Sequence, residues 1–590
     1  MSGTVGGEIR GSALEEAISS LQSENDGSSW VFEYGDGGLG YTADSVDSAG
    51  WSVWRDGHRG GVIHGAVTNL PELGIDSEEL FDRLLRAPLQ TARQIQGPFL
   101  IAAYDGSDRR HVVVTDKLGS RPCYYTETDP VQFASSTDVL LEAIDDPTLN
   151  HQGVSDMLLL GHMWGTRTLV EEIRALRPAT VMEIVDGECR TERYWQPSYE
   201  ELPPGERYLD ELSDRYRQAV RRARNTMPDG AGIWLSGGLD SRTTAAQLVA
   251  GEDDPTDWLT AFTYDANPPT RDNPRIASKI ARKLGIEFEE VPLVPDAFGE
   301  HFERVIESTD GMVRWNTTLN LSASYNVERP PPVMLEGMQG ALLGDHLLRP
   351  HLTEFSDPVD CQLASEATTS VETVRSLLTV DVEPLRSLEK EVEDTSETSY
   401  RRRILDIHFK NYYNRSALAS NQVMRDRVGS RVLQADGDYL DWCARLPTSY
   451  RVGTFPFTDS RVPYGTSRAK LGLVRRIDPE LAEVTYERTK VKPSWPYPVH
   501  VAGFVGNVVG NRLRSKPTYG SGQLADFWIR DERTQIHRYV HDLVEDARSR
   551  SLFDGDAVAE VYEDHMDGSN NAGMLSQITT LEHWIQNHLD

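Results

Sequence analysis

The residues most suggestive of chemistry lie in one short stretch, IWLSGGLDSRTTAAQ, from Ile233 to Gln247. The apolar run Gly232–Leu235 predicts a strand, and the residues from Ser241 onward predict a helix. Two glycines lie between them. Glycines let backbone N–H groups approach an anion closely, and the N-terminus of a helix adds a partial positive charge. The stretch therefore predicts a phosphate-binding turn.

An acid inside this turn indicates a metal ion as well. The hydroxyls of Ser236 and Ser241 would donate to phosphate, but the carboxylate of Asp240 would repel it unless magnesium lay between them. The stretch lacks the Lys-Ser/Thr ending of a Walker loop and the G-x-G-x-x-G of a dinucleotide fold. A tight turn that needs glycine only for its geometry is the alternative, and six suitable residues in one turn favour function.

The elements around this turn predict its position in a larger fold. Strand and helix patterns alternate from Asp210 to about residue 290, which indicates a parallel sheet with helical crossovers. Residues 1–200 contain short apolar runs bounded by turn residues and are β-rich. The polar, proline-bearing stretch QPSYEELPPGERY separates the two regions as a linker, and the chain beyond about Ser370 is largely helical.

Composition narrows the function classes. The chain has 92 acids and 60 bases, a net charge of −32, and only nine lysines against fifty-one arginines. An acidic, lysine-poor surface is typical of salt adaptation and argues against nucleic-acid binding. The four cysteines have no metal or redox spacing and are interpreted as reduced thiols. With no signal-peptide pattern and no apolar run of membrane-spanning length, we expect a cytoplasmic protein with no membrane partner.

Several motifs together resemble one family. SGGLDS is the signature of the ATP pyrophosphatase, or PP-loop, enzymes, and its surroundings resemble the asparagine synthetase family, which includes the β-lactam synthetases. The segments that carry the resemblance, in order, are GPFLIAAYD, TDKLGSRPCYY, FASSTDVLLEAI, LRPATVMEI with RYW, and SRVLQADGDYLDWCARLP. The resemblance implies an α/β protein: an N-terminal αββα Ntn-hydrolase-like sandwich over 1–200, and a PP-loop parallel-sheet domain with a helical C-terminal part over 205–590.

The family's chemistry would begin with ATP. A substrate carboxylate, aspartate or similar, attacks the α-phosphate, pyrophosphate leaves, and an amine or ammonia converts the acyl-adenylate to an amide with release of AMP. The resemblance implies Mg²⁺ held by Asp240 and Asp345, small-molecule partners only, and a homodimer as the assembly to consider. The residues implied to bind ATP and pyrophosphate are Leu235, Ser236, Gly237, Gly238, Asp240, Ser241, Tyr264 and Gly337.

The N-terminus departs from the glutamine-using members of the family. Those begin Met-Cys-Gly, whereas this chain begins with Met1, Ser2 and Gly3, and a serine is a weaker nucleophile than a thiol. The family's glutamine-gripping NGEIYN is HGAVTN here, so its first Asn and its Glu are missing. Asp76 matches the family's amine-binding Asp. We expect no glutaminase activity at Ser2.

A second departure concerns the family's SGEGSDE loop. The matching stretch is LEGMQGALLGDHLLRP, and a position-by-position match puts Ala341 and Leu342 where Asp and Glu belong. A shifted match uses Gly344 and Asp345 instead. We favour the shifted match, because two carboxylates hold a magnesium–pyrophosphate group better than one. A loop acid in an acid-rich protein is the alternative.

The resemblance assigns several further residues. Lys490 matches the Lys of the family's R-x-K segment, which neutralises charge on the α-phosphate, and Lys492 is the competing choice. Arg431 and Asp436 match the family's R-x-P-F-L-D segment. Asp310 matches a family region near the substrate. His408 lies on an apolar helical stretch, which predicts a place in the core and not in catalysis.

Three functions remain open from the sequence. The first is an ATP-dependent, asparagine synthetase-type amide ligase. The second is a β-lactam synthetase- or peptide-cyclase-like ligase that acts on another carboxylate. The third is a non-catalytic scaffold that binds ATP. Pyrophosphate release from ATP, screened over candidate carboxylates, separates them.

Overall fold

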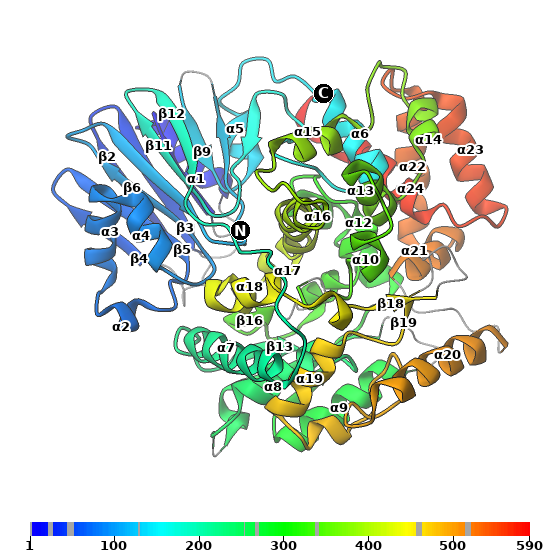
Figure 1. The fold of residues 1–590 in the computed structure, drawn as a ribbon. Helices are drawn as coiled ribbons and strands as arrows, with labels where there is room; N and C mark the ends of the chain where they lie inside the picture. Colours follow the sequence, from blue (N-terminus) through cyan, green and yellow to red (C-terminus); the bar gives the residue numbers. More distant parts are fainter. Residues whose placement is uncertain are drawn as a thin grey trace.

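Two six-stranded antiparallel sheets form the N-terminal part of the chain (Figure 1). The computed structural model describes residues 3–21, 28–43, 52–127, 130–252, 254–265, 271–336, 342–455, 463–513 and 521–590. The first sheet has the order β10 (Ile173–Ala175), β8 (Tyr124–Thr126), β9 (Gln132–Ala134), β1 (Gly3–Gly7), β3 (Gly37–Ala43), β2 (Ser28–Tyr34). The second has the order β12 (Glu188–Arg193), β11 (Thr180–Val185), β7 (Arg110–Thr115), β6 (Phe99–Asp105), β5 (Arg59–Gly65), β4 (Ser52–Asp56).

The alternation of side chains along these strands builds the layers. On β5, Val62 faces the core between the two sheets, and its neighbour Ile63 faces the helices α3 (Ser77–Arg86) and α4 (Pro88–Gln94). Helix α1 (Ser12–Leu21) covers the outer face of the first sheet. A Cβ on Gly61 would lie 2.4 Å from the Phe81 ring, so glycine is needed for this close approach. The expected αββα sandwich is confirmed.

The second part of the chain is built on a five-stranded parallel sheet. Its order is β15 (Glu287–Glu290), β14 (Leu259–Thr263), β13 (Ala231–Trp234), β16 (Val333–Glu336), β17 (Gly429–Val432). The chain moves outward from β13 to β14 and β15, then returns to the other side of β13 for β16. The sheet order therefore reverses between β13 and β16, and α/β sheets bind ligands at such a point.

Helices cover both faces of this sheet. One face packs on α7 (Glu206–Arg224), α8 (Asp240–Leu248), α9 (Asp272–Leu284), α18 (Gly437–Ala444) and α19 (Arg468–Ile477). The larger helical region includes α6 (His151–Leu160), α10 (Pro295–Gly299), α11 (Phe302–Glu307), α12 (Trp315–Thr318), α13 (Pro358–Glu366), α14 (Val371–Leu377), α15 (Arg386–Asp394), α16 (Tyr400–His408), a π-helix (Phe409–Leu418) and α17 (Gln422–Arg425). The C-terminal helices are α20 (Tyr497–Leu513), α21 (Ser521–Arg530), α22 (Gln535–Ser549), α23 (Gly555–Met566) and α24 (Ala572–His588). The described part of the chain contains no helix with the length and hydropathy that a bilayer crossing requires.

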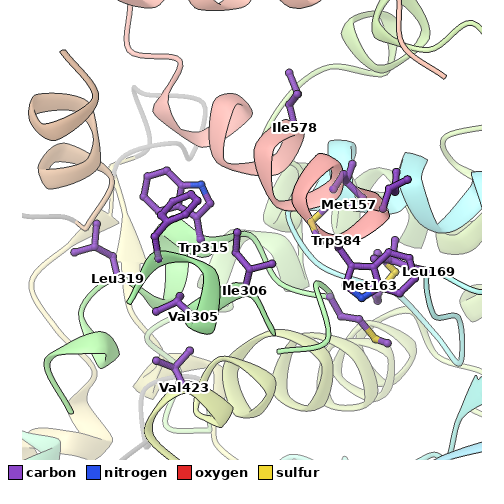
Figure 2. Packing of buried hydrophobic residues seen from close by; sticks show 14 of the residues in the cluster. Met157, Met163, Leu169, Val305, Ile306, Trp315, Leu319, Val423, Ile578 and Trp584 are labelled. Carbon is purple, nitrogen blue, oxygen red and sulfur yellow. The ribbon is translucent and has the colours of Figure 1, made fainter. Parts of the chain in front are cut away.

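One large core joins the sandwich to the helical region, since it includes Val5 of β1 and Leu14 of α1. Figure 2 shows Met157 and Leu169, from α6 and the loop after it, near Trp584 of the C-terminal helix α24. The same core continues through α11 to Trp315 of α12, whose indole Nε1 donates to Thr579 Oγ1 at 2.9 Å. The two parts of the chain therefore share buried apolar surface.

We expect Trp584→Ala to destabilise the protein by about 3–5 kcal/mol, because this fully buried side chain would leave a cavity at the centre of the shared core. The midpoint of urea unfolding, followed by tryptophan fluorescence and circular dichroism, measures the effect. Phe527→Ala on α21 is the matched control, since this ring is 52% exposed. Equal midpoints for the two variants would contradict the central place of Trp584.

Candidate functional site

A cavity of about 280 Å³ opens at the point where the order of the parallel sheet reverses. Its walls come from the turn after β13, the ends of β14 and β16, and helices α9, α17 and α19. The lining residues are Trp234, Leu235, Ser236, Gly238, Leu239, Asp240, Ser241, Thr263, Tyr264, Asn273, Leu321, Glu336, Asn421, Met424, Lys470 and Tyr486. Most residues predicted to bind ATP therefore line one cavity.

The turn between β13 and α8 is held by its own side chains. Ser241 Oγ accepts from the backbone N–H of Ser236 at 2.9 Å and lies 3.0 Å from Ser236 Oγ, which accepts from the N–H of Gly238 at 3.1 Å. The N–H of Gly237 donates to Asn273 Oδ1 at 2.8 Å, and Asn273 Nδ2 donates to the carbonyl of Tyr264 at 2.7 Å. The turn thus keeps its shape through hydroxyl and amide groups.

A buried arginine fixes the same turn to a distant segment. The guanidinium of Arg242, which is 0% exposed, donates to the carbonyls of Gly237 and Gly238 at 2.8 Å each and to that of Val484 at 2.7 Å. Its acceptors in the described residues are backbone carbonyls, and burial lowers the pKa of Arg242 to about 10. Arg242 therefore anchors the turn and does not face the cavity as a free cation.

Two carboxylates meet at one lysine beside the turn. Lys470 Nζ, on α19, donates to Asp240 Oδ2 at 2.7 Å and forms a second short ion pair with Asp345. The other oxygen of each carboxylate, Oδ1, is buried and has no hydrogen-bond partner among the described residues. The structure thus brings Asp345 next to Asp240, as the shifted match of the 335–350 segment requires.

The charges of Asp240, Asp345 and Lys470 favour a cation at this position. Burial, with the neighbouring charge of Asp345, raises the pKa of Asp240 in spite of Lys470. Burial lowers the pKa of Lys470, but the two carboxylates outweigh it and the net shift is upward. A protonated lysine between two acids is therefore the resting state. Two adjacent carboxylates with unpartnered oxygens are also the ligands that Mg²⁺ prefers, so these residues fit the ion that the sequence predicts.

Another part of the cavity lining contains Trp234, Tyr264 and Met424. The Trp234 and Tyr264 rings meet edge to face with centroids 5.4 Å apart, and Trp234 Nε1 lies 3.3 Å from Met424 Sδ. Beside them, the buried carboxylate of Glu336 accepts from Arg425 Nε at 2.8 Å and Nη2 at 3.0 Å. Arg425 also donates to the carbonyl of Ser120, so this wall contacts the N-terminal sandwich.

Lys490 lies at the rim and not in the cavity lining. Its Nζ donates to Asp272 Oδ2 at 2.7 Å, and its backbone adopts a φ of 58°. Asp272 directly precedes Asn273, which lines the cavity. Lys492 is exposed and pairs with Glu483 at 3.1 Å. The lysine in the cavity lining is Lys470, which no sequence motif singles out.

Other predicted residues stabilise the fold where the structure places them. Arg431 donates to Thr226, and Asp436 caps α18 and pairs with Arg222 at 2.6 Å. Asp76 caps α3 by accepting from Glu79 N–H at 2.9 Å.

Asp310 accepts from Ser136 Oγ at 2.7 Å and joins the helical region to the sandwich. His408 is buried against Glu366, and Leu342 is also buried. Ser2, Gly337 and Ala341 lie outside the described residues.

Comparison with known families agrees with this architecture. A family model described as "Glutamine amidotransferase domain" matches residues 74–195, and one described as "Asparagine synthase" matches residues 211–586, more than half of the chain. The chain belongs to the asparagine synthase family. The predicted resemblance is thus confirmed, and it makes the protein a member of a family of ATP-dependent carbon–nitrogen ligases that generally use Mg²⁺.

Individual known proteins give no further information about the site. No curated protein matches the sequence. One similar solved structure is titled "Structure of the allosteric regulatory enzyme of purine biosynthesis"; it is 12% identical, with 50% of this chain and 81% of that chain covered and a TM-score of 0.26. Another is the glutamine phosphoribosylpyrophosphate amidotransferase from B. subtilis complexed with ADP and GMP, at 10% identity, 50% and 82% coverage and a TM-score of 0.25. At these TM-scores neither structure informs the site.

An acid beside the turn gives a pH test of this geometry. A Cβ on Gly237 would lie 2.8 Å from Glu487 Oε2, and burial raises the pKa of Glu487 from 4.5 to about 6. The folded state thus binds a proton more tightly than the unfolded state. The resulting stability is fully present below pH 4.5 and is lost as the pH rises through 6.

We therefore expect Glu487→Gln to be more stable than the parent at pH 7, by at most about 2 kcal/mol, with the difference vanishing below pH 4.5. Urea unfolding midpoints measured from pH 4 to 8 test this. Glu480→Gln, which changes an exposed acid in the same segment, is the control and should differ from the parent by the same amount across this pH range. A difference between parent and Glu487→Gln that grows toward low pH would contradict the assignment.

Proposed function

We propose that the protein is an ATP-dependent, AMP-forming amide ligase that activates a substrate carboxylate as an acyl-adenylate and releases pyrophosphate. The observation that carries the proposal is the meeting of Asp240 and Asp345 at Lys470, with two buried carboxylate oxygens left without partners among the described residues. This group lies directly beside a strand–glycine–helix turn. A scaffold that only bound adenosine would have no need for two paired carboxylates at this position.

In this proposal Asp240 and Asp345 would hold Mg²⁺, and the ion would neutralise charge on the leaving pyrophosphate. The turn 236–241 supplies the phosphate contacts. Ser236 and Ser241 would exchange their mutual hydrogen bond for phosphate oxygens, and the first N–H groups of α8 would donate as well. The backbone at Leu235 and Tyr264 would contact the adenosine.

Two lysines have distinct roles in the proposal. Lys470 is already charged and buried beside both carboxylates, so its ammonium would stay next to the pyrophosphate and balance its charge. Lys490 is held at the rim by Asp272. On leaving Asp272 it would neutralise the charge that develops on the α-phosphate, as its place in the R-x-K segment implies.

The nature of the acyl substrate has a second candidate. Aspartate is the substrate of asparagine formation, but the wall formed by Trp234, Leu321 and Met424 is apolar, and the nearby Glu336 is occupied by Arg425. An apolar wall favours a larger carboxylate, as a β-lactam synthetase- or peptide-cyclase-like ligase would use. The amine would then come from the substrate or from ammonia.

The N-terminal sandwich, residues 1–200, is proposed to lack glutaminase activity. In HGAVTN, the buried His64 packs on the Tyr41 ring with centroids 5.7 Å apart, and burial lowers the pKa of His64 so that it is neutral. Asn69 accepts from the N–H of Gln96 at 2.8 Å and donates to the carbonyl of Gln94 at 2.9 Å. Asn69 is therefore engaged in the fold and not free to hold glutamine.

We expect Lys470→Met and Lys490→Ala each to slow pyrophosphate release by about a hundredfold, because each removes a charge that opposes a developing negative charge in the site. For Lys490→Ala, ATP affinity should change little. Pyrophosphate release at saturating Mg-ATP, screened over candidate carboxylates at high salt, measures both effects. Asp240→Asn should abolish Mg²⁺-dependent turnover.

Lys492→Ala is the matched control, since this exposed lysine lies two residues from Lys490 and pairs with Glu483. It should turn over at the parent rate. If Lys492→Ala slows the reaction and Lys490→Ala does not, the assignment of the rim lysine is wrong. If no carboxylate elicits pyrophosphate release although ATP binds, the scaffold function replaces the ligase.

We also expect no glutamate to accumulate when the protein is given glutamine with Mg-ATP and a turned-over carboxylate. Ammonia or the substrate's own amine should support the reaction. A coupled glutamate assay measures this. Glutamate that appears in the parent and disappears in Ser2→Ala would show a working glutaminase and overturn the expectation.

A further inference from the structure

A second cluster of titratable side chains lies just beyond Asp345. Glu366, at the end of α13, contacts two imidazoles through the same oxygen: His346 Nε2 lies 3.1 Å from Oε1, and His408 Nδ1, at the end of α16, lies 3.3 Å from it. The three groups together provide ligand atoms that all lie within 4.8 Å of one another. The ligase chemistry proposed above uses none of them.

The distances from Glu366 to the two histidine nitrogens match the ligand spacing of a tetrahedral metal centre. Zinc bonds to nitrogen and oxygen are about 2.0–2.1 Å long, so neighbouring ligands of a tetrahedral ion lie about 3.3–3.4 Å apart. Glu366 and His408 are 7% and 5% exposed, and His346 is less buried, which leaves one side open for an ion to enter. Tyr412 stacks on His346 with centroids 3.6 Å apart and on His408 at 5.0 Å, and so holds both rings nearly parallel.

The partners of Glu366 also point to a cation. Among the deeply buried carboxylates, Glu336 pairs with Arg425 and Glu391 with Arg177, whereas Asp116 accepts from Ser120 and from backbone N–H groups. Glu366 instead contacts two imidazoles and the hydroxyl of Ser365.

We propose that His346, Glu366 and His408 form a binding site for a divalent transition metal of the zinc class. Two nitrogens and one carboxylate oxygen select such an ion over Mg²⁺, which prefers oxygen ligands only. Water completes the fourth position. Because His346 directly follows Asp345, the ion ties the loop that carries this carboxylate to α13 and α16. The site is separate from the ATP cavity and its metal binding does not depend on the ligase reaction.

A second group, Asp138, Glu307 and His588, also has its ligand atoms within 4.8 Å of one another. It differs because both oxygens of Glu307 already have partners: Oε1 contacts His583 and Asn587 at 3.0 Å each, and Oε2 contacts His588 at 3.0 Å. On α22, His537 and His541 are spaced by one helical turn and could bind zinc weakly at the surface. These two groups provide matched controls.

The test uses the full-length protein, freed of metal with a chelator and titrated with Zn²⁺ by calorimetry and with Co²⁺ by absorption spectroscopy. We expect one tightly bound Zn²⁺ per chain and the intense visible bands of tetrahedral Co²⁺. His346→Ala and His408→Ala should each weaken Zn²⁺ binding at least about a hundredfold, because each removes a ligand. Zn²⁺ should raise the melting temperature of the parent but not of His346→Ala.

His588→Ala and His541→Ala should bind Zn²⁺ like the parent. Loss of the bound ion in either of them, with retention in His346→Ala, would overturn the proposal. The Co²⁺ spectrum of the parent tests the site without any variant. A spectrum of weak bands like that of aqueous Co²⁺ would mean that the three side chains form only a hydrogen-bonded His–Glu–His cluster.

Discussion

Two carboxylates that carry like charges lie within reach of one ammonium group, and the synthetase part of the structure is arranged around this contact. Asp240 starts α8, Asp345 lies in the loop after β16, and Lys470 comes from α19. Buried acids this close repel each other unless a cation lies between them. Each of the three elements therefore depends on the other two for its position, and the cation that satisfies the acids is either the lysine or a metal ion.

The sheet determines that these elements meet. Because the order of the strands reverses between β13 and β16, the connections at the carboxyl ends of these two strands diverge and leave a crevice. Arg242 then fixes the turn after β13 to the segment around Val484, which follows α19 along the chain. The shared core of Trp584 and Met157 holds the N-terminal sandwich against the helical region, so the wall near Arg425 is also fixed.

Local patterns account for what could be predicted from the sequence. The strand, the glycines and the helix of the 236–241 turn are neighbours in the chain, and alternating strands and helices determine the parallel sheet. Lys470 is different, because it meets Asp240 across 230 positions and its own helix has an ordinary amphipathic pattern. The scarcity of lysine is the available signal, and it applies to Lys490 as well as to Lys470. Asp345 could be predicted from the sequence only by shifting the alignment of the 335–350 segment with the family's SGEGSDE loop, because this segment fits two alignments.

Arginine and lysine have different roles in this structure, and this difference explains why the scarcity of lysine is informative. The planar guanidinium group of arginine can donate to two carbonyls, or to both oxygens of a carboxylate, at once. In this structure it stabilises the fold, because Arg242 donates to the carbonyls of the turn and Arg425 donates to Glu336. Lysine's ammonium is a compact point charge that takes up less space between two carboxylates than a guanidinium does. In a chain with fifty-one arginines and nine lysines, the residue between these two carboxylates is a lysine, and the proposed reaction would place Mg²⁺ beside the same carboxylates. An arginine at position 470 would satisfy both acids in the resting state, but its larger fork would occupy the space that Mg²⁺ and pyrophosphate need.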